Sequence, residues 1–115
     1  MTSPVVVPIK PLTAAAIIAV VTTQFGMTVP EIKEKTKRHE VVHPRQIAMY
    51  LIKQLTSASF LYIGRLFGRM HHSTVMYAIE KIDRLRKSDP NLNAQIVALI
   101  NHLQGMTTVG GKHDA

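Results

Sequence analysis

The chain has 115 residues, of which 14 are Lys or Arg and 7 are Asp or Glu, giving a formal net charge of +7. This length allows one small domain and excludes a large multidomain enzyme, because folding buries only about two-thirds of the unfolded surface. The chain has no cysteine, which excludes disulfides, thiolate metal sites and cysteine nucleophiles and makes the reducing cytoplasm the expected location. Excess positive charge attracts phosphate backbones and anionic lipid surfaces, and nucleic acid is the leading candidate partner.

The N-terminal segment, residues 1–11, is predicted to be a flexible leader. Three of its residues are proline, which fixes φ and lacks a backbone donor, so a helix cannot form there. The apolar run over residues 14–21 is too short to span a membrane, and no small-residue cleavage site of a secretory signal follows it. We therefore expect no membrane partner.

Apolar periodicity predicts a first helix directly after the leader. Ile17, Val21 and Phe25 recur every four residues from Thr13 on, and Gly26 ends the pattern.

A capping-box pattern indicates a second, short helix. In Thr28-Val-Pro-Glu31 a hydroxyl and a carboxylate are three residues apart, and we expect a helix over residues 31–36. A basic cluster then ends it, made of Lys33, Lys35, Lys37 and Arg38.

A stronger helix is predicted from His43 to about residue 55. Pro44 is tolerated in a first turn, where its missing N–H costs little, and Ile47, Leu51 and Leu55 form a buried stripe.

Two further helices are predicted on either side of a glycine. Residues 59–67 place Phe60, Ile63 and Phe67 on one face, and Gly68 follows where a left-handed cap residue is expected. Residues 72–86 carry a second stripe, made of Val75, Ile79, Ile82 and Leu85. Two helices joined at Gly68 are a helix-turn-helix candidate.

A last amphipathic helix is predicted over residues 92–103, ended by Gly105. We expect residues 12–104 to form one domain and residues 105–115 to be a disordered tail. The fold class is therefore all-α, a compact bundle of five to six helices with a helix-turn-helix core.

Positive charge is concentrated around this helix-turn-helix. Between positions 35 and 79 the chain has one acid, Glu40, and seven basic residues, namely Lys35, Lys37, Arg38, Arg45, Lys53, Arg65 and Arg69. A one-sided cluster beside such a motif favours DNA over an ordinary solvated surface.

The second motif helix begins with imidazoles and hydroxyls, in the sequence Met70-His-His-Ser-Thr74. This is the end of the helix that enters a major groove, where these groups can hydrogen-bond to base edges. The alternative is that Ser73 and Thr74 only cap the helix.

Several stretches resemble the C-terminal DNA-binding domain of the bacterial replication initiator DnaA. They are His43-Pro-Arg-Gln-Ile-Ala-Met-Tyr-Leu-Ile-Lys-Gln-Leu-Thr56, Ile63-Gly-Arg-Leu-Phe-Gly68, His72-Ser-Thr-Val75 and Ala78-Ile-Glu-Lys-Ile82. The resemblance covers residues 12–103 and is densest from Pro44 to Ile82. It implies a Trp-repressor-like helical domain that binds a short asymmetric box in duplex DNA, with a basic loop in the minor groove and the second motif helix in the major groove.

The resemblance also implies which residues contact DNA. Lys37 matches the loop residue that enters the minor groove. Positions that contact the DNA backbone are matched by Arg45, Gln46 and Lys53, and the base-reading signature is matched by His71, His72, Ser73 and Thr74. The predicted set is completed by Arg38, Arg69 and the helix start Phe60-Leu61, where the family has Leu-Pro.

Departures from the family pattern concern specificity. The usual signature Gly-Gly-Arg-Asp-His-Thr-Thr-Val is here Gly68-Arg-Met-His-His-Ser-Thr-Val75, so His71 stands at the aspartate position. A carboxylate accepts from cytosine N4 whereas an imidazole can donate to guanine, so we expect a different box. Asp is a good N-cap and His a poor one, and Ser73 is expected to cap the helix one turn later.

No glycine-rich phosphate loop with Lys-Ser/Thr occurs in these 115 residues, so no ATP-binding motor, nucleotide or other cofactor is expected. We expect a stand-alone, complete small protein of bacterial or phage origin, monomeric and nucleoid-associated. It would act as a regulator of replication or transcription, or as a competitor, at initiator-type boxes.

Two other classes of function are considered. An enzyme or metal site built on His71-His-Ser73 is disfavoured because adjacent helical residues point apart and no paired carboxylates support them. The alternative is a drifted helix-turn-helix that binds DNA non-specifically or binds a protein partner through the 92–103 helix or through the apolar leader.

Overall fold

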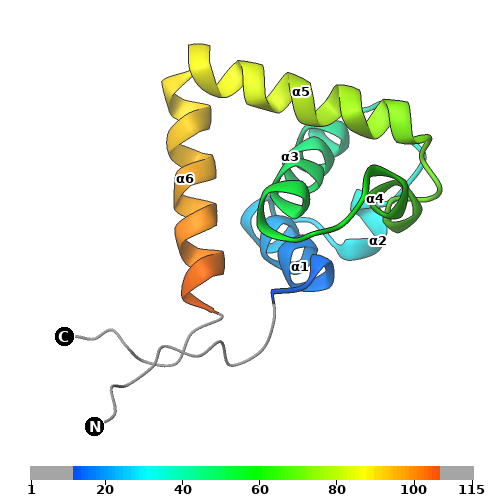
Figure 1. Ribbon diagram of the computed structural model, residues 1–115, viewed down its shortest axis with the longest axis horizontal. Coiled ribbons are helices and arrows are strands. Elements are labelled where there is room, and N and C mark those ends of the chain that lie inside the picture. Colours follow the sequence, from blue (N-terminus) through cyan, green and yellow to red (C-terminus); the bar gives the residue numbers. More distant parts are fainter. Residues whose placement is uncertain (1–11, 107–115) are drawn as a thin grey trace, which may run out of the picture.

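The computed structural model describes residues 12–106, which form six α-helices and, within that range, no strand (Figure 1). The helices are α1 (Ala14–Gln24), α2 (Val29–Ile32), α3 (His39–Leu55), α4 (Phe60–Leu66), α5 (His72–Ser88) and α6 (Pro90–Gly105). The all-α prediction is therefore confirmed. The predicted leader 1–11, and residues 107–115 of the predicted tail, lie outside the described residues.

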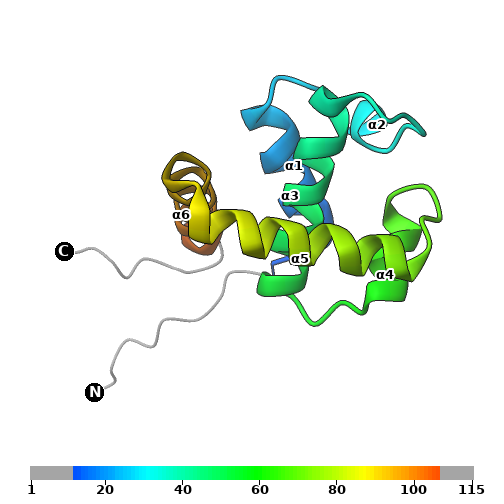
Figure 2. The same cartoon turned by 90° about the horizontal axis from the view of Figure 1, so that it is seen from above.

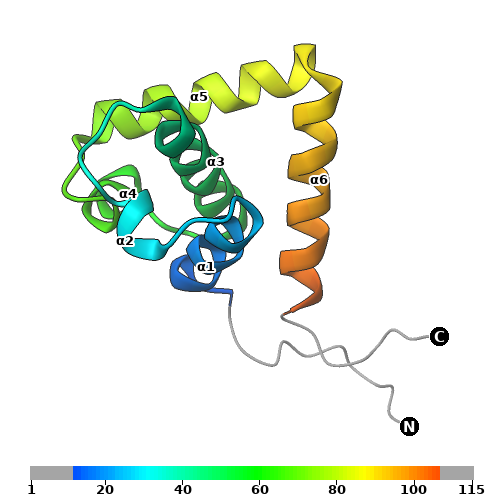
Figure 3. The same cartoon turned by 180° about the vertical axis from the view of Figure 1, so that it is seen from behind.

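Helix α3 is the centre of the core, and α1, α2, α4 and α5 pack around it. Helix α5 crosses one end of α3, and α6 runs back from the far end of α5 beside α1 (Figures 1 and 3). Every helix contributes fully buried side chains, among them Ile17, Ile32, Leu51, Ile63, Ile82 and Ile96. Both helices of the helix-turn-helix, α4 and α5, thus pack on α3, while α6 packs against α5 and α1.

Helix α2 differs from its prediction, since it begins and ends earlier than residues 31–36. Thr28 is the N-cap: its Oγ1 accepts from Glu31 N at 3.2 Å, and Glu31 Oε1 accepts from Thr28 N at 2.7 Å. The helix therefore starts directly after Thr28. The helix stops at Ile32, whose carbonyl accepts from the Arg45 side chain at 2.9 Å. In a longer helix this carbonyl would instead accept from a backbone N–H of the next turn.

Helix α3 begins at His39, four residues before its predicted start at His43. The Arg38 carbonyl accepts from Val41 N and Val42 N at 3.0 and 2.9 Å, which closes a first turn ahead of Pro44. Val41 is 3% exposed, so burial of this side chain favours the extra turn. Pro44 then lies inside the helix.

The turn between α4 and α5 is held by close backbone contacts. Gly68 has φ of +78°, as predicted for a left-handed cap, and Arg69 follows with φ of +62°. The Gly64 carbonyl accepts from Met70 N at 2.8 Å, and a Cβ on Gly64 would lie 2.1 Å from the Met70 carbonyl oxygen. Only glycine fits at position 64, so this contact sets how α5 leaves α4.

Helices α5 and α6 meet at Asp89, whose carboxylate accepts from Asn91 N and Leu92 N, both at 3.1 Å (Figure 2). Arg86 ties this corner to α3, donating to Asn93 Oδ1 and to Tyr50 Oη, both at 2.8 Å. Helix α6 therefore starts at Pro90, two residues before its prediction, and ends at Gly105. Within residues 12–106 we find no helix with the length and apolar character of a membrane span.

Candidate nucleic-acid interface

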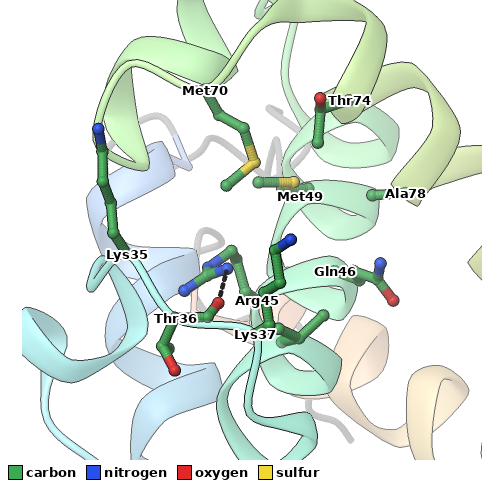
Figure 4. Close-up of a pocket in the computed structure, with 10 residues that line it drawn as sticks. Lys35, Thr36, Lys37, Arg45, Gln46, Met49, Met70, Thr74 and Ala78 are labelled. Carbon is green, nitrogen blue, oxygen red and sulfur yellow. Dashed lines mark hydrogen bonds between the residues drawn. The ribbon is translucent and has the colours of Figure 1, made fainter.

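Three segments that are distant in sequence surround one cavity of about 560 Å³ (Figure 4). They are the loop between α2 and α3, the first half of α3, and the turn before α5 with its first residues. The lining residues include Lys35, Thr36, Lys37, Gln46, Met49, Met70 and Thr74. The fold thus brings together the predicted minor-groove loop and the predicted base-reading helix.

Arg45 also lines this cavity, next to the loop, and is only 5% exposed. Its Nε donates to Ile32 O at 2.9 Å, its Nη1 to Thr36 O at 3.4 Å and its Nη2 to Glu34 O. Burial lowers the pKa of Arg45, and the Glu34 carboxylate partly opposes this effect. Each guanidinium nitrogen thus donates to one loop carbonyl, and the DNA-backbone contact at Arg45 stays a prediction.

Two lysines are the loop cations that line the cavity. Lys35 and Lys37 are exposed, and both side chains rise from the loop toward the Met70 and Thr74 side of the cavity (Figure 4). Arg38 is also exposed but has acidic neighbours, Glu34 at 3.6 Å and Glu40 at 3.4 Å. The positive charge on the cavity side of the loop thus comes from the two lysines.

A second cavity, of about 760 Å³, adjoins the first. It is lined by Leu61, Arg65, Arg69, Met70, His71 and His72, and Met70 borders both cavities. Neither set of lining residues, all drawn from positions 12–106, contains an acidic side chain. The two cavities together form a positively charged surface, which we call the basic face.

His71 caps the N-terminus of α5, contrary to the expectation that histidine caps poorly and that Ser73 would cap instead. Its Nδ1 accepts from Ser73 N at 3.1 Å and lies 2.7 Å from Ser73 Oγ, and its ring stacks on His72 with centroids 4.4 Å apart. When Nδ1 accepts this N–H, the neutral imidazole carries its proton on Nε2. The exposed ring then offers a donor at Nε2.

Lys53 and Phe60 lie together where α3 connects to α4. The Lys53 ammonium donates to Ala58 O at 3.1 Å and lies 4.3 Å from the centroid of the Phe60 ring. Neither residue lines the two cavities, whereas Leu61, one position on, does. These two predicted residues therefore lie apart from the basic face.

Tyr77 was missed by the sequence analysis. It is 57% exposed on α5, and it follows Thr74 by three residues and Ser73 by four, so it extends the same helix face. The helical spacing from Ser73 was the available signal. Arg65, assigned only to the general charge, is placed beside Arg69 and the two histidines. Within residues 12–106, no three His, Cys, Asp or Glu side chains form a group able to hold a metal ion.

Comparison with known proteins gives consistent results. The model of the family described as bacterial dnaA protein helix-turn-helix matches residues 14–82. The chromosomal replication initiator protein DnaA of Chloroflexus aggregans is 36% identical over 95 residues, which are 83% of this chain and 20% of that protein. The protein of the same name from Thermus thermophilus is 48% identical over 73 residues, 64% of this chain and 17% of the relative.

A solved structure described as the crystal structure of a DNA replication initiation factor superposes with a TM-score of 0.71 and 27% identity. The match covers 78% of this chain and 27% of that one. The chain spans about a fifth of the length of the Chloroflexus aggregans and Thermus thermophilus proteins.

Proposed function

We propose, from the fact that this chain belongs to the bacterial DnaA helix-turn-helix family, that it is a sequence-specific reader of duplex DNA. The observation that carries the proposal is the basic face, where cations and hydrogen-bonding side chains from three segments meet without an acidic neighbour in the cavity linings. Phosphate contacts give such a surface affinity, and base-edge contacts give it specificity.

The N-terminus of α5 is the segment that enters the major groove. There His71, His72, Ser73 and Thr74 are exposed and present donors and acceptors to base edges. Tyr77 continues this face by one turn. On the basic face, phosphate or minor-groove contacts come from Lys35, Lys37, Gln46, Arg65 and Arg69, and Leu61 packs on the DNA backbone. Outside the two cavities, Arg38, Lys53 and Phe60 contact the backbone of the flanking DNA.

His71 selects the base that it meets by the polarity of its hydrogen bond. Because Nδ1 accepts from Ser73 N, Nε2–H is the group available to DNA. Guanine offers two acceptors in the major groove, at O6 and N7, whereas cytosine offers a donor at N4. We therefore expect guanine at this position of the box.

The role that follows is occupancy of initiator-type boxes in the cytoplasm, as a regulator or competitor. The relatives are named chromosomal replication initiator proteins, and no phosphate-binding loop occurs in these 115 residues. Box binding by this chain would thus proceed without ATP.

Selection of bound duplexes from a random-sequence pool tests the proposal, performed in parallel with the chain and with the variant His71→Asp. Aspartate also caps a helix but has acceptors only, so the fold of α5 is kept while hydrogen-bond polarity at the base is reversed. We expect two related motifs that differ at one position, guanine for the chain and cytosine for the variant, with discrimination of about 1–3 kcal/mol.

Three other outcomes are informative. Identical motifs would contradict the role of His71. Salt-sensitive binding without any motif would indicate a non-specific DNA protein. Absence of binding would contradict the proposal and favour the protein-interaction alternative.

A further inference from the structure

We propose that Arg45 is a positioning residue, which fixes the loop carrying Lys35 and Lys37 in the orientation that DNA requires. The inference rests on the proposed function, because it assigns a cause to the geometry of the same basic face. This role is additional to the backbone contact that the resemblance implies at this position.

The first step is the geometry of the guanidinium. Its three nitrogens donate to the carbonyls of Ile32, Glu34 and Thr36, every second residue along the loop. A planar guanidinium presents its donors in a fixed fork, so it fixes the relative orientation of these carbonyls. A lysine ammonium at the same place is a point charge on a flexible stem and cannot fix three acceptors in this way.

The second step is that the loop has few other buried contacts between its ends. Ile32 is fully buried at one end and Val41 is 3% exposed at the other. Between them, the Arg38 ion pairs with Glu34 and Glu40 lie at the surface, where such pairs contribute little. Arg45 is therefore the main restraint on the loop backbone.

The third step connects the loop to the helix-turn-helix. The Lys33 carbonyl oxygen would lie 3.3 Å from a Cβ placed on Gly68, so the loop abuts the turn that leads to α5. With Arg45 holding its carbonyls inward, Lys35 and Lys37 rise toward Met70 and Thr74 (Figure 4). The restraint thus sets the spacing between the minor-groove lysines and the major-groove helix.

The first test needs no DNA. In Arg45→Met the buried stem remains while every donor is removed, and we expect the ¹⁵N order parameters of residues 33–38 to fall from about 0.85 to below about 0.6. Arg86→Met is the matched control, because Arg86 also donates to two internal acceptors, Tyr50 Oη and Asn93 Oδ1, but far from this loop. A loop that stays rigid in Arg45→Met, as in the control, would overturn the proposal.

The second test separates positioning from direct contact with DNA. We expect Arg45→Met and Lys37→Met each to weaken binding about tenfold, and the double variant to be little weaker than either one. Arg45→Lys should fail to restore affinity, since it retains the charge but loses the fork. Additive losses together with rescue by Arg45→Lys would overturn the proposal, because Arg45 would then act through its charge alone.

The two tests also distinguish this inference from the proposed function. If the chain binds no duplex at all while the loop of Arg45→Met becomes mobile, the DNA-binding function has failed and with it the purpose assigned to Arg45. If the chain binds DNA and the loop of Arg45→Met stays rigid, only the inference about Arg45 has failed.

Discussion

Helices α1 and α6 contrast with the rest of the molecule in their charge. Neither residues 12–27 nor residues 90–106 contain a Lys, Arg, Asp or Glu, and every charged residue that the structure describes lies between Glu31 and Asp89. A cavity of about 500 Å³ between α1 and α6 is lined, within the described part of the chain, without any Lys, Arg, Asp or Glu, by side chains that include Ala16, Val20, Gln95 and Ala98. One small fold thus separates the uncharged helices α1 and α6, which stabilise it, from the charged region to which we assign DNA recognition.

One contact between the two regions is made by His43. Its ring packs edge-on against Phe25 at the end of α1, with centroids 6.3 Å apart, and it stacks on His39 at 5.3 Å. Substitutions on either side of this contact should therefore affect stability and DNA binding to different degrees.

The largest expected effect is on the uncharged side. Ile96 in α6 is fully buried, and Ile96→Ala should lower the free energy of unfolding by about 2–5 kcal/mol through lost burial and a cavity. Urea unfolding measures this loss, and the dependence of DNA affinity on salt should not change. Val97→Ala, at a neighbouring position that is 39% exposed, is the control and should cost at most about 0.5 kcal/mol. A change in the salt dependence would break the separation of the two regions.

A second substitution acts inside the recognition region. Gly64→Ala places a Cβ 2.1 Å from the Met70 carbonyl oxygen, so the turn must move, at a cost of about 1–3 kcal/mol. Because α5 then shifts, discrimination between boxes should fall more than non-specific affinity, as competition binding would measure. Gly105→Ala, where nothing lies within 4 Å of the new Cβ, should leave both properties nearly unchanged. Unaltered box discrimination in Gly64→Ala would contradict the role given to this turn.

A third substitution should raise stability and lower affinity together. Arg69 has φ of +62°, a conformation that disfavours a side chain, so Arg69→Gly should add about 1 kcal/mol to the free energy of unfolding. It also removes one cation of the basic face, and the slope of log affinity against log salt should fall by about one. Arg69→Ala is the matched variant: the same affinity loss is expected without the stability gain. Equal stability in the two variants would show that position 69 is not strained.

The smallest effect is a pH dependence at the contact between the regions. Burial lowers the pKa of His43 below 6.5, assisted by His39 and Lys81 and opposed by Asp89. The stability contributed by the neutral ring is complete above the unfolded pKa of about 6.5 and is lost as pH falls toward the lower folded pKa. Urea midpoints between pH 8 and pH 5 should fall more steeply for the chain than for His43→Phe. Parallel curves would contradict this assignment.

The sequence predicted the helices well where apolar residues recur at helical spacing, as in α1 and α5. It also predicted the end of α4, where Gly68 adopts the expected left-handed conformation. It misplaced the ends that depend on tertiary contacts. The early end of α2 is set by Arg45, thirteen residues further on, and the early start of α3 by the burial of Val41. Local signals such as Pro44 carry no information about such partners.

For the candidate site, the resemblance identified residues that the fold does bring together, including Lys37, Thr74 and His71. It did not reveal that Arg45 donates to three loop carbonyls, because these bonds depend on the path of a loop that no pattern describes. It also missed the cap at His71, since an imidazole accepts a backbone N–H only at a particular rotamer and tautomer.

The path of the chain into α1 and out of α6 has a practical consequence. Both ends of the described fold lie on the side away from the turn that begins α5 (Figures 1 and 2). A cargo fused to either end, or a tether that immobilises the domain on a sensor surface, would leave the same face open to an incoming duplex. Attachment through Leu12 or through Met106 should therefore be interchangeable.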